Sequence, residues 1–210
     1  MKSSFLKTSG LLIGVACLAP SAISNPTSEL ADLLGDNNSF SASFQQVVRD
    51  KDGSALENVK GKISIQDNKI RWEIEEPYVQ TIIVRDGLMT IYDPDLEQLV
   101  VRKLNEGFLA NPIGLLLGNG RQIERYFTVE SDKSGKSSFL LEPLEGIKQI
   151  PSLILRFDAG RIDMVIIRDR LNQSTRIDFS SHVKIFDDSD LTFELEVPPG
   201  TDIIGSGLLQ

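Results

Sequence analysis

The chain has 210 residues, of which 22 are Lys or Arg and 30 are Asp or Glu, so its formal net charge at pH 7 is −8. This acidity argues against a surface that neutralises nucleic-acid phosphates and against adsorption to anionic lipid surfaces. The length fits one domain with a sizeable core, and a single histidine and a single cysteine leave too few ligands for an ordinary metal site.

Residues 1–24 have the three regions of a secretory signal peptide. Two lysines precede the apolar stretch 11–19, and small residues lead up to Ser24. The apolar stretch is too short to span a bilayer as a helix. We expect cleavage after Ser24, which leaves residues 25–210 as one domain with 20 basic and 30 acidic residues, a net charge of about −10.

Cys17 leaves open another fate for the same segment. The run Gly14-Val15-Ala16-Cys17 is similar to a degenerate lipobox, in which the cysteine would be acylated and the protein kept on a membrane. A typical lipobox has leucine three residues before the cysteine, where this chain has Gly14. If the peptide is instead cleaved after Ser24, the remaining chain has no cysteine on which an oxidising compartment could act.

Most of the remaining chain has the pattern of short β-strands, with alternating or β-branched and aromatic residues. The expected strands are Ala42–Val48, Val59–Ile65, Ile70–Ile74, Thr81–Val84, Met89–Tyr92, Leu99–Arg102, Arg125–Glu130, Ser138–Leu141, Leu153–Phe157, Met164–Arg168, Thr175–Phe179 and Leu191–Glu196. Turn signals such as Asp67-Asn68 and Asp86-Gly87 separate them. This short, regular spacing predicts one strongly curved antiparallel sheet or barrel, and it argues against βαβ units.

Two segments have helical periodicity instead. In Ser28–Gly35, Leu30, Leu33 and Leu34 lie on one face, and Gly35 stands where a glycine often follows a helix. The second segment, Asn111–Gly118, begins with an N-cap asparagine and a proline at the first helical position, and its apolar face consists of Ile113, Leu116 and Leu117. Two short amphipathic helices in a β protein could plug the end of a barrel or cover a cavity.

Catalytic motifs are weak. His182 lies in Ser180-Ser181-His182 without a G-x-S-x-G elbow, and we expect it to be a solvated surface residue. The acid pairs Glu75-Glu76 and Asp187-Asp188 are expected to be turn and surface charges, because adjacent residues of a strand point to opposite faces. We therefore expect no catalytic residue, no metal site and no cofactor.

The one tryptophan, Trp72, shares a strand face with Ile70 and Ile74. This face predicts a core or the wall of a cavity, two roles that sequence does not separate. Further candidates for the same surface are Phe40, Phe44, Ile63, Ile65, Ile82, Val84, Tyr92 and Val101.

Several short runs, taken in order, resemble one family. They are Ser39–Gln46, Gly61-Lys62-Ile63, Ile70-Arg71-Trp72, Glu76-Pro77, Asp86-Gly87, Tyr92-Asp93-Pro94, Gln98, Asn111–Leu116, Phe193-Glu194-Leu195 and Pro198-Pro199-Gly200. Each run alone is common in β proteins, but their order and spacing over residues 29 to 204 are those of the periplasmic outer-membrane lipoprotein carrier proteins, the LolA family.

The resemblance implies a mainly β fold in which one curved antiparallel sheet forms an unclosed half-barrel, with short helices as a lid over an apolar cavity. It implies that acyl chains meet Phe40, Phe44, Ile63, Ile65, Ile70, Trp72, Ile74 and Tyr92, beneath a lid made by Leu30, Leu33, Leu34, Ile113, Leu116 and Leu117. It further implies a monomeric periplasmic shuttle for acylated lipoproteins, loaded by an ATP-dependent inner-membrane transporter and unloaded by an outer-membrane receptor, without nucleic acid as a partner.

One departure concerns control of the lid. Family members commonly carry an Arg-Pro pair in the turn before the aromatic strand, and its arginine helps to hold the lid closed. This chain has Gln66-Asp67-Asn68 there and is one residue shorter between Gly61 and Trp72. We do not transfer the arginine's role to Arg71. Besides the carrier, two other hypotheses remain: a membrane-anchored receptor or lipid sensor of the same fold, if Cys17 is acylated, and a secreted hydrolase.

Overall fold

The computed structural model describes residues 25–104, 114, 116, 120–132, 137–145, 152–185 and 193–205. The expected signal peptide with Cys17 lies outside the described residues, as do Ile113 and Leu117 of the second expected helix and the acid pair Asp187-Asp188.

Strands dominate the described part of the chain. They are β1 (Ser39–Arg49), β2 (Ala55–Gln66), β3 (Lys69–Glu76), β4 (Gln80–Arg85), β5 (Leu88–Asp93), β6 (Gln98–Lys103), β7 (Phe127–Asp132), β8 (Ser137–Pro143), β9 (Ser152–Asp158), β10 (Arg161–Arg168), β11 (Ser174–Lys184) and β12 (Asp202–Ile204). The helices are α1 (Pro26–Asp36) and α3 (Gly120–Tyr126), and residues 114 and 116 are also helical.

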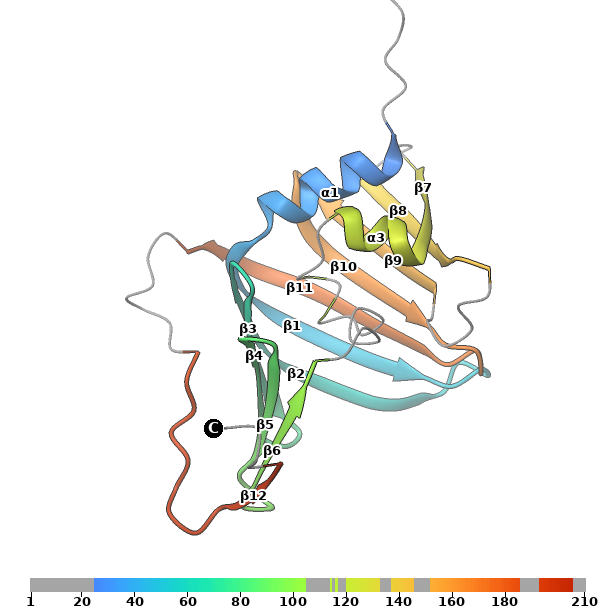
Figure 1. Cartoon of the computed structure of the whole chain (residues 1–210). Coiled ribbons are helices and arrows are strands. Elements are labelled where there is room, and N and C mark those ends of the chain that lie inside the picture. The colour runs from blue at the N-terminus through green and yellow to red at the C-terminus, as the bar shows by residue number, and fades with distance from the viewer. Residues whose placement is uncertain are drawn as a thin grey trace, which may run out of the picture.

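These strands form one sheet in the order β12-β6-β5-β4-β3-β2-β1-β11-β10-β9-β8-β7. All neighbours are antiparallel except β12, which pairs parallel to β6. We call β2–β6 the amino-terminal arm and β7–β11 the carboxy-terminal arm; β1 joins them. Figure 1 shows that the sheet bends sharply between the arms and that α1 and α3 cover the inside of the carboxy-terminal arm. The expected mainly β fold with one curved, open sheet is therefore confirmed.

The bend is accompanied by irregular pairing near β1. The register between β1 and β11 shifts between Ser41 and Ser43, and that between β2 and β3 shifts between Lys60 and Gly61. Such bulges bend a strand and increase its twist. At Gly61 the two strands also approach closely, because a Cβ there would collide with the carbonyl oxygen of Glu73. Only glycine permits this approach.

Helix α1 is longer than its apolar periodicity predicts. Asn25 caps its start, with Oδ1 accepting a hydrogen bond from the backbone N–H of Thr27 at 3.0 Å, and Pro26 takes the first helical position. Gly35 was expected just past the end of the helix, but it lies inside, and Asn37 is the C-cap. Asparagine is, after glycine, a common residue at helix ends, so the glycine was the misleading signal.

Two expected strands differ from the structure. The strand expected from Arg125 begins instead at Phe127, because α3 continues to Tyr126. The described residues of the expected strand Leu191–Glu196, from Phe193 onward, lie outside any strand. Their apolar–polar alternation reflects another arrangement: Phe193 is buried, Glu194 and Glu196 are exposed, and the segment packs across the outside of the sheet.

Candidate functional site

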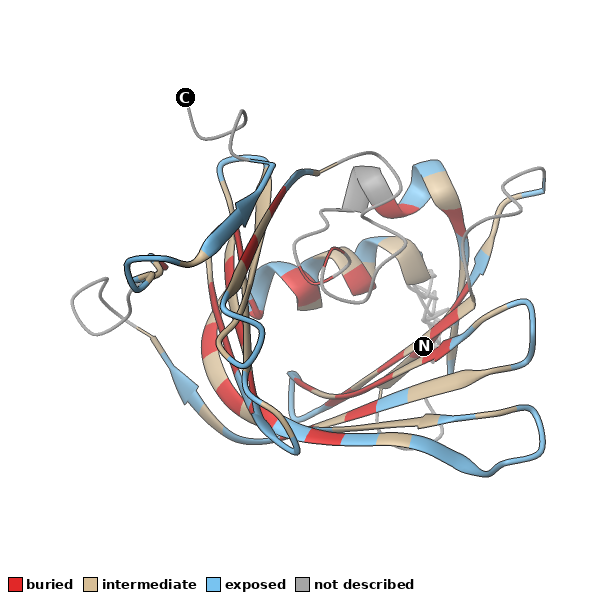
Figure 2. Ribbon diagram, turned by 90° about the horizontal axis from the view of Figure 1, so that it is seen from below, coloured by how far each residue is buried: buried red, intermediate tan, exposed pale blue. Residues whose placement is uncertain are grey.

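A continuous row of apolar side chains lies on the concave face of the amino-terminal arm. Ile63 on β2 pairs with Trp72 on β3, and Trp72 pairs with Ile82 on β4. Directly paired residues of antiparallel strands point to the same side of the sheet. The same pairing produces a neighbouring row of Ile65, Ile70 and Val84. Trp72 is 3% exposed, and Figure 2 shows buried residues along the strands of both arms.

Three aromatic rings from three strands meet at the bend of the sheet. The rings of Phe44 and Trp72 have centroids 4.2 Å apart, and Phe179 on β11 meets Trp72 edge-on at 6.5 Å. Phe44 pairs with Gly61 on one side and with Phe179 on the other. This cluster therefore connects the apolar face of one arm to that of the other.

The carboxy-terminal arm provides the second wall. Phe139 on β8 and Phe157 on β9 meet edge-on with centroids 5.9 Å apart, and both are at most 1% exposed. They belong to the same buried cluster as Trp72. Further members of the cluster from this arm are Phe127, Leu141, Leu153, Leu155, Ile162, Val165, Ile167, Ile177 and Phe179.

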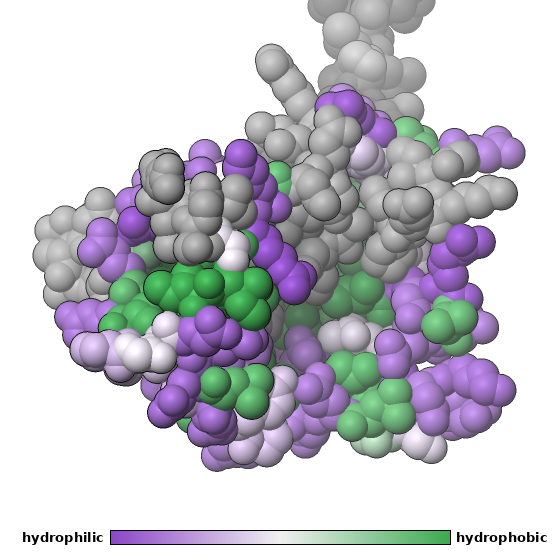
Figure 3. Space-filling model, turned by 60° about the horizontal axis from the view of Figure 1, so that its bottom comes forward, coloured by the Kyte–Doolittle hydropathy of each residue, from purple (hydrophilic) through white to green (hydrophobic). Residues whose placement is uncertain are grey.

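The helices add their apolar faces to this cluster. Leu30 and Leu34 of α1 are buried, Leu33 packs against the cluster while partly exposed, and Leu116 is buried as well. Ile123 of α3 is 2% exposed and is also a member. The covering helices and both arms thus share one apolar interior. Seen from below, apolar side chains gather around the hollow between the arms (Figure 3).

The structure brings together most of the candidate residues. Those on the concave face are Phe40, Phe44, Ile63, Ile65, Ile70, Trp72 and Ile74, each at most 7% exposed. The helical candidates that join the apolar cluster or pack against it are Leu30, Leu33, Leu34 and Leu116. Ile113 and Leu117 are outside the described residues.

Tyr92 does not belong to this surface. It pairs with Thr81, and Thr81 pairs with Glu73, so all three side chains lie on the convex face. The same argument moves Val101 to the convex face, through its partner Thr90. Alternation predicts that one side of a strand is apolar but not which way that side faces, and the register of the hairpins decides it.

Sequence reasoning missed Ile123 and the wall formed by Phe139 and Phe157. The two phenylalanines occur in strands that the alternation predicted, but no face had been assigned to them. Ile123 lies in a short helix whose apolar periodicity is too brief to be recognised.

His182 was expected to be solvated, and it is half-buried instead. Its Nε2 is buried without a hydrogen-bond partner among the described residues, and its ring lies 5.4 Å from that of Phe40. Burial lowers the pKa of His182 below its usual value, and the positive charge of Arg161 adds to this lowering. Ser180 and Ser181 are exposed, so this neutral histidine is not accompanied by a buried nucleophile in its own segment.

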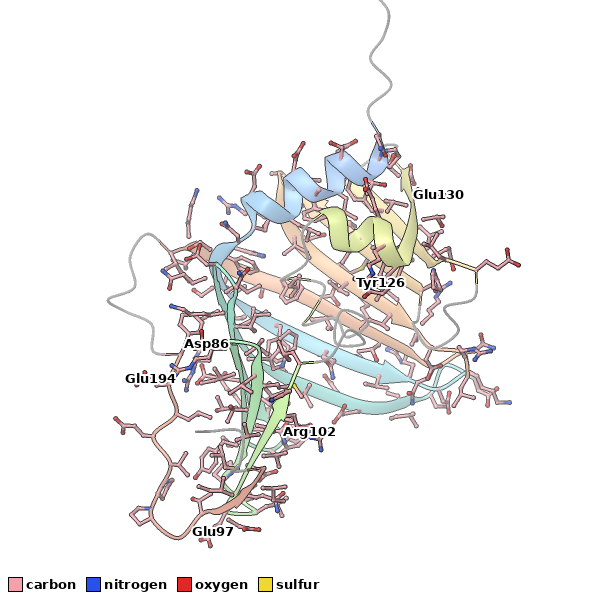
Figure 4. The ribbon with its side chains drawn as sticks, in the orientation of Figure 1. Asp86, Glu97, Arg102, Tyr126, Glu130 and Glu194 are labelled. Atoms are coloured by element: carbon pink, nitrogen blue, oxygen red, sulfur yellow. The ribbon has the colours of Figure 1, made fainter. Side chains whose placement is uncertain are left out.

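The convex face carries a second hollow, of about 530 Å³, beneath the extended segment 193–197. Its floor is apolar, with Ile83 and Leu99, and Phe193 forms part of its cover. Asp86 and Glu194 lie close together at its rim (Figure 4).

Basic residues of the sheet hold this segment in place. The guanidinium of Arg85 donates to the carbonyl oxygen of Phe193 at 3.3 Å and to the carboxylate of Glu194 at 3.2 Å. Arg71 donates to the carbonyl oxygen of Glu194 at 3.2 Å, and Lys69 lies over the ring of Phe193. Arg71 therefore faces the C-terminal segment on the convex side of the sheet.

Comparisons with known proteins agree with this architecture. A family model described as "Outer membrane lipoprotein carrier protein LolA" matches residues 36–196. An outer-membrane lipoprotein carrier protein of Chromohalobacter salexigens is 33% identical over 181 residues, which cover 85% of this chain and 86% of the relative. One from Pseudomonas aeruginosa is 30% identical over 192 residues, covering 90% of this chain and 92% of the relative.

Solved structures show a similar fold at low sequence identity. An uncharacterized conserved protein from Thermus thermophilus has a TM-score of 0.53 at 11% identity, covering 84% of this chain and 97% of that one. The MucA/MucB complex of Pseudomonas aeruginosa gives a TM-score of 0.50 at 13% identity, covering 82% and 62%. Among the described residues, no helix is both long and apolar enough to span a bilayer. The family match and the relatives show that the chain belongs to the outer-membrane lipoprotein carrier protein family, LolA.

Proposed function

We propose that this protein binds the acyl chains of lipoproteins and carries them across the periplasm, without catalysing a reaction. The observation that supports this most directly is the single apolar cluster to which both arms of the open sheet and the covering helices contribute. The relatives named as lipoprotein carriers support the same role, since the match extends over most of both chains.

The physical need for a carrier follows from the size of the cargo. A triacylated lipoprotein has about 45 methylenes that would be exposed in water, and at about 0.8 kcal/mol each their transfer costs on the order of 36 kcal/mol. A binding site that recovered all of this free energy would not release its cargo. Non-covalent affinities in fact saturate near 18 to 21 kcal/mol, roughly half that amount. The carrier must therefore bind acyl chains with only part of the available free energy.

An apolar covering residue such as Leu116, packed against an apolar sheet, provides such a limit. Acyl chains that enter the interior compete with contacts that Leu116 and the sheet already make with each other. Binding is weakened by the free energy of those contacts, and release restores them. This allows the protein to be loaded and unloaded by partners with suitable affinities.

We propose the partners that the family implies: an ATP-dependent transporter of the inner membrane that loads the carrier and a receptor at the outer membrane that accepts the cargo. The protein then acts as a monomer in the periplasm, after removal of residues 1–24, and needs no cofactor. Its net charge of about −10 in residues 25–210 disfavours adsorption to anionic membranes, which suits a protein that must leave them.

A release assay tests this function. The full chain is exported, purified from the periplasm and incubated with spheroplasts that export a labelled triacylated lipoprotein. We expect the label to appear in solution in a one-to-one complex. If the folded protein releases no lipoprotein, the carrier function is wrong.

The mass of the exported protein tests the membrane-anchored alternative. Cleavage after Ser24 predicts a soluble product that begins at Asn25, whereas acylation of Cys17 predicts a heavier, membrane-bound product that begins at that cysteine.

A further inference from the structure

Asn37 is a buried polar residue at the junction of α1 and β1, with 8% of its surface exposed. Its side-chain amide donates one hydrogen bond to the carbonyl oxygen of Leu33, at 2.7 Å, and another to that of Gly160, at 2.8 Å. Its Oδ1 accepts a hydrogen bond from the backbone N–H of Ile162 at 3.1 Å. Both amide hydrogens and the oxygen are therefore used.

These bonds connect parts of the chain that are distant in sequence. Leu33 is in the last turn of α1, whereas Gly160 and Ile162 are at the hairpin between β9 and β10, in the carboxy-terminal arm. The backbone N–H of Asn37 also bonds the carbonyl oxygens of Leu33 and Leu34. One side chain thus ends the helix and attaches that end to the β9–β10 hairpin.

The rest of α1 is associated with the same arm. Its principal neighbours among the helices and strands are α3 and β7. On the other side of the junction, the carbonyl oxygen of Asn38 accepts a hydrogen bond from the backbone N–H of Asp67, in the β2–β3 turn, at 2.9 Å. Asn37 is therefore bonded to the carboxy-terminal arm, and the next residue, Asn38, is bonded to the amino-terminal arm.

Detaching α1 from its arm would disrupt this arrangement. If α1 were lifted together with Asn37, the carbonyl oxygen of Gly160 and the N–H of Ile162 would both lose their partner; if Asn37 stayed behind, the helix end would lose its side-chain bond to the carbonyl oxygen of Leu33. Buried polar groups that lose a partner are costly, and each must then be reached by water. A helix attached in this way resists being lifted.

We propose that α1 is a stationary wall of the acyl-chain site, and that Asn37 is the positioning residue that fixes it to the carboxy-terminal arm. Leu30, Leu33 and Leu34 then line the site without moving, and acyl chains enter without displacement of α1. This inference rests on the proposed carrier function and assigns to α1 a role other than that of a moving lid.

A covalent tether between α1 and the hairpin tests the stationary wall. Asp36 and Arg161 are exposed and line the same pocket of about 280 Å³, so cysteines at both positions can be joined by a short bis-maleimide. The double variant D36C/R161C is loaded in the spheroplast assay before and after crosslinking, with each single variant treated with the same reagent as a control. We expect uptake to change less than about twofold. A loss of tenfold or more on crosslinking alone would show that α1 must move.

Hydrogen exchange on the empty protein tests the role of Asn37 independently of any cargo. Asn37→Ala removes all three side-chain hydrogen bonds, and we expect amides of α1 to exchange at least about tenfold faster, with β4 unchanged. Asn37→Asp keeps an acceptor for Ile162 but loses both donors, and a comparable acceleration is expected. Asn38→Ala is the matched control, because Asn38 uses only its backbone in this junction.

The two tests separate the two proposals. Unchanged exchange in Asn37→Ala would overturn the role of Asn37, whatever the cargo assay shows. If the unmodified protein fails to release lipoprotein, the carrier function fails, while the attachment of α1 is still decided by exchange. In a functional carrier, α1 should also exchange equally slowly when empty and when loaded, and faster exchange on loading would contradict the stationary wall.

Discussion

Phe44 on β1 packs against Trp72 on β3, with ring centroids 4.2 Å apart and the ring planes tilted by 38°, although β2 lies between the two strands. The residue of β2 that pairs with Phe44 is Gly61, and a Cβ at Gly61 would lie 3.0 Å from the ring of Phe44. The absence of a side chain at Gly61 therefore allows both the close approach of β3 and the contact between the rings. A glycine in a strand here has a packing function that its low β-propensity would not suggest.

Replacing Gly61 with alanine should be strongly destabilising. The added Cβ would overlap the carbonyl oxygen of Glu73, so the strands must separate, and we expect a loss of about 1–3 kcal/mol or more in the free energy of unfolding. Urea denaturation measures this. Gly35→Ala is the matched control: nothing lies within 4 Å of its Cβ and it is in a helix, so it should be neutral or stabilise by up to about 1 kcal/mol.

A charge on the concave face should prevent cargo uptake, whereas the same charge on the convex face should not. Ile82 and Tyr92 are both partly buried, but Ile82 pairs with Trp72 and Tyr92 points to the opposite side. We expect Ile82→Asp to reduce lipoprotein release at least tenfold, because an acyl chain cannot solvate a carboxylate. Tyr92→Asp should release lipoprotein within about twofold of normal. Equal effects would show that the face assignment does not determine binding.

The covering segment can be tested at Leu116, which is 7% exposed. Leu116→Asp should impair lipoprotein release, because the buried carboxylate opposes closure over the apolar cluster. Leu171→Asp, at a leucine that is 79% exposed, controls for the added charge. Circular dichroism establishes that both variants are folded, and normal release by a folded Leu116→Asp protein would remove this residue from the site.

Loss of Arg85 should loosen the C-terminal segment. Arg85→Ala removes the two hydrogen bonds to Phe193 and Glu194, so we expect limited proteolysis near Phe193 to become several-fold faster. Cleavage is followed by mass spectrometry. Lys62→Ala, which removes an exposed ion pair with Glu75, should leave the rate unchanged. If both variants are cut at the same rate as the unmodified protein, Arg85 does not hold the segment.

The pH dependence of stability should report on His182. Burial lowers its pKa in the folded protein, so between that lowered value and its unfolded pKa of about 6.5 the unfolded state binds more protons. The neutral, buried ring therefore makes its full contribution to the free energy of unfolding above about pH 6.5, and this contribution decreases as the pH falls through this window. We expect His182→Phe, which does not titrate, to lose less stability than the unmodified protein between pH 7 and pH 5, measured by urea denaturation at each pH. Parallel curves would contradict the burial of a neutral histidine.

Local patterns predicted the strands well where one face of a strand is buried. In β3 the alternation of Ile70, Trp72 and Ile74 follows directly from burial of every second residue, and the structure confirms it. The segment from Phe193 shows the limit of this reasoning. It alternates because it packs flat on another surface, and periodicity does not distinguish that from pairing in a sheet.

The sequence predicted the residues of the candidate site only where neighbouring residues in the chain determine their placement. Tyr92 was misplaced because the direction of its face depends on pairing with Thr81. The attachment of Asn37 to the hairpin carried no local signal, because its partners there, Gly160 and Ile162, are more than 120 residues away. An asparagine near a helix end predicts a cap. That this cap also reaches another hairpin is a property of the tertiary structure alone.

An open sheet can admit a ligand, but its two outermost strands could also attract other proteins. In the described part of the chain, β12 covers β6 with three residues, and at the opposite end β7 presents Glu130 and Asp132 as exposed side chains. Very short edge strands and charged side chains both discourage pairing with another chain. The protein can therefore keep its interior accessible while remaining protected against self-association, a hazard that a closed barrel does not have.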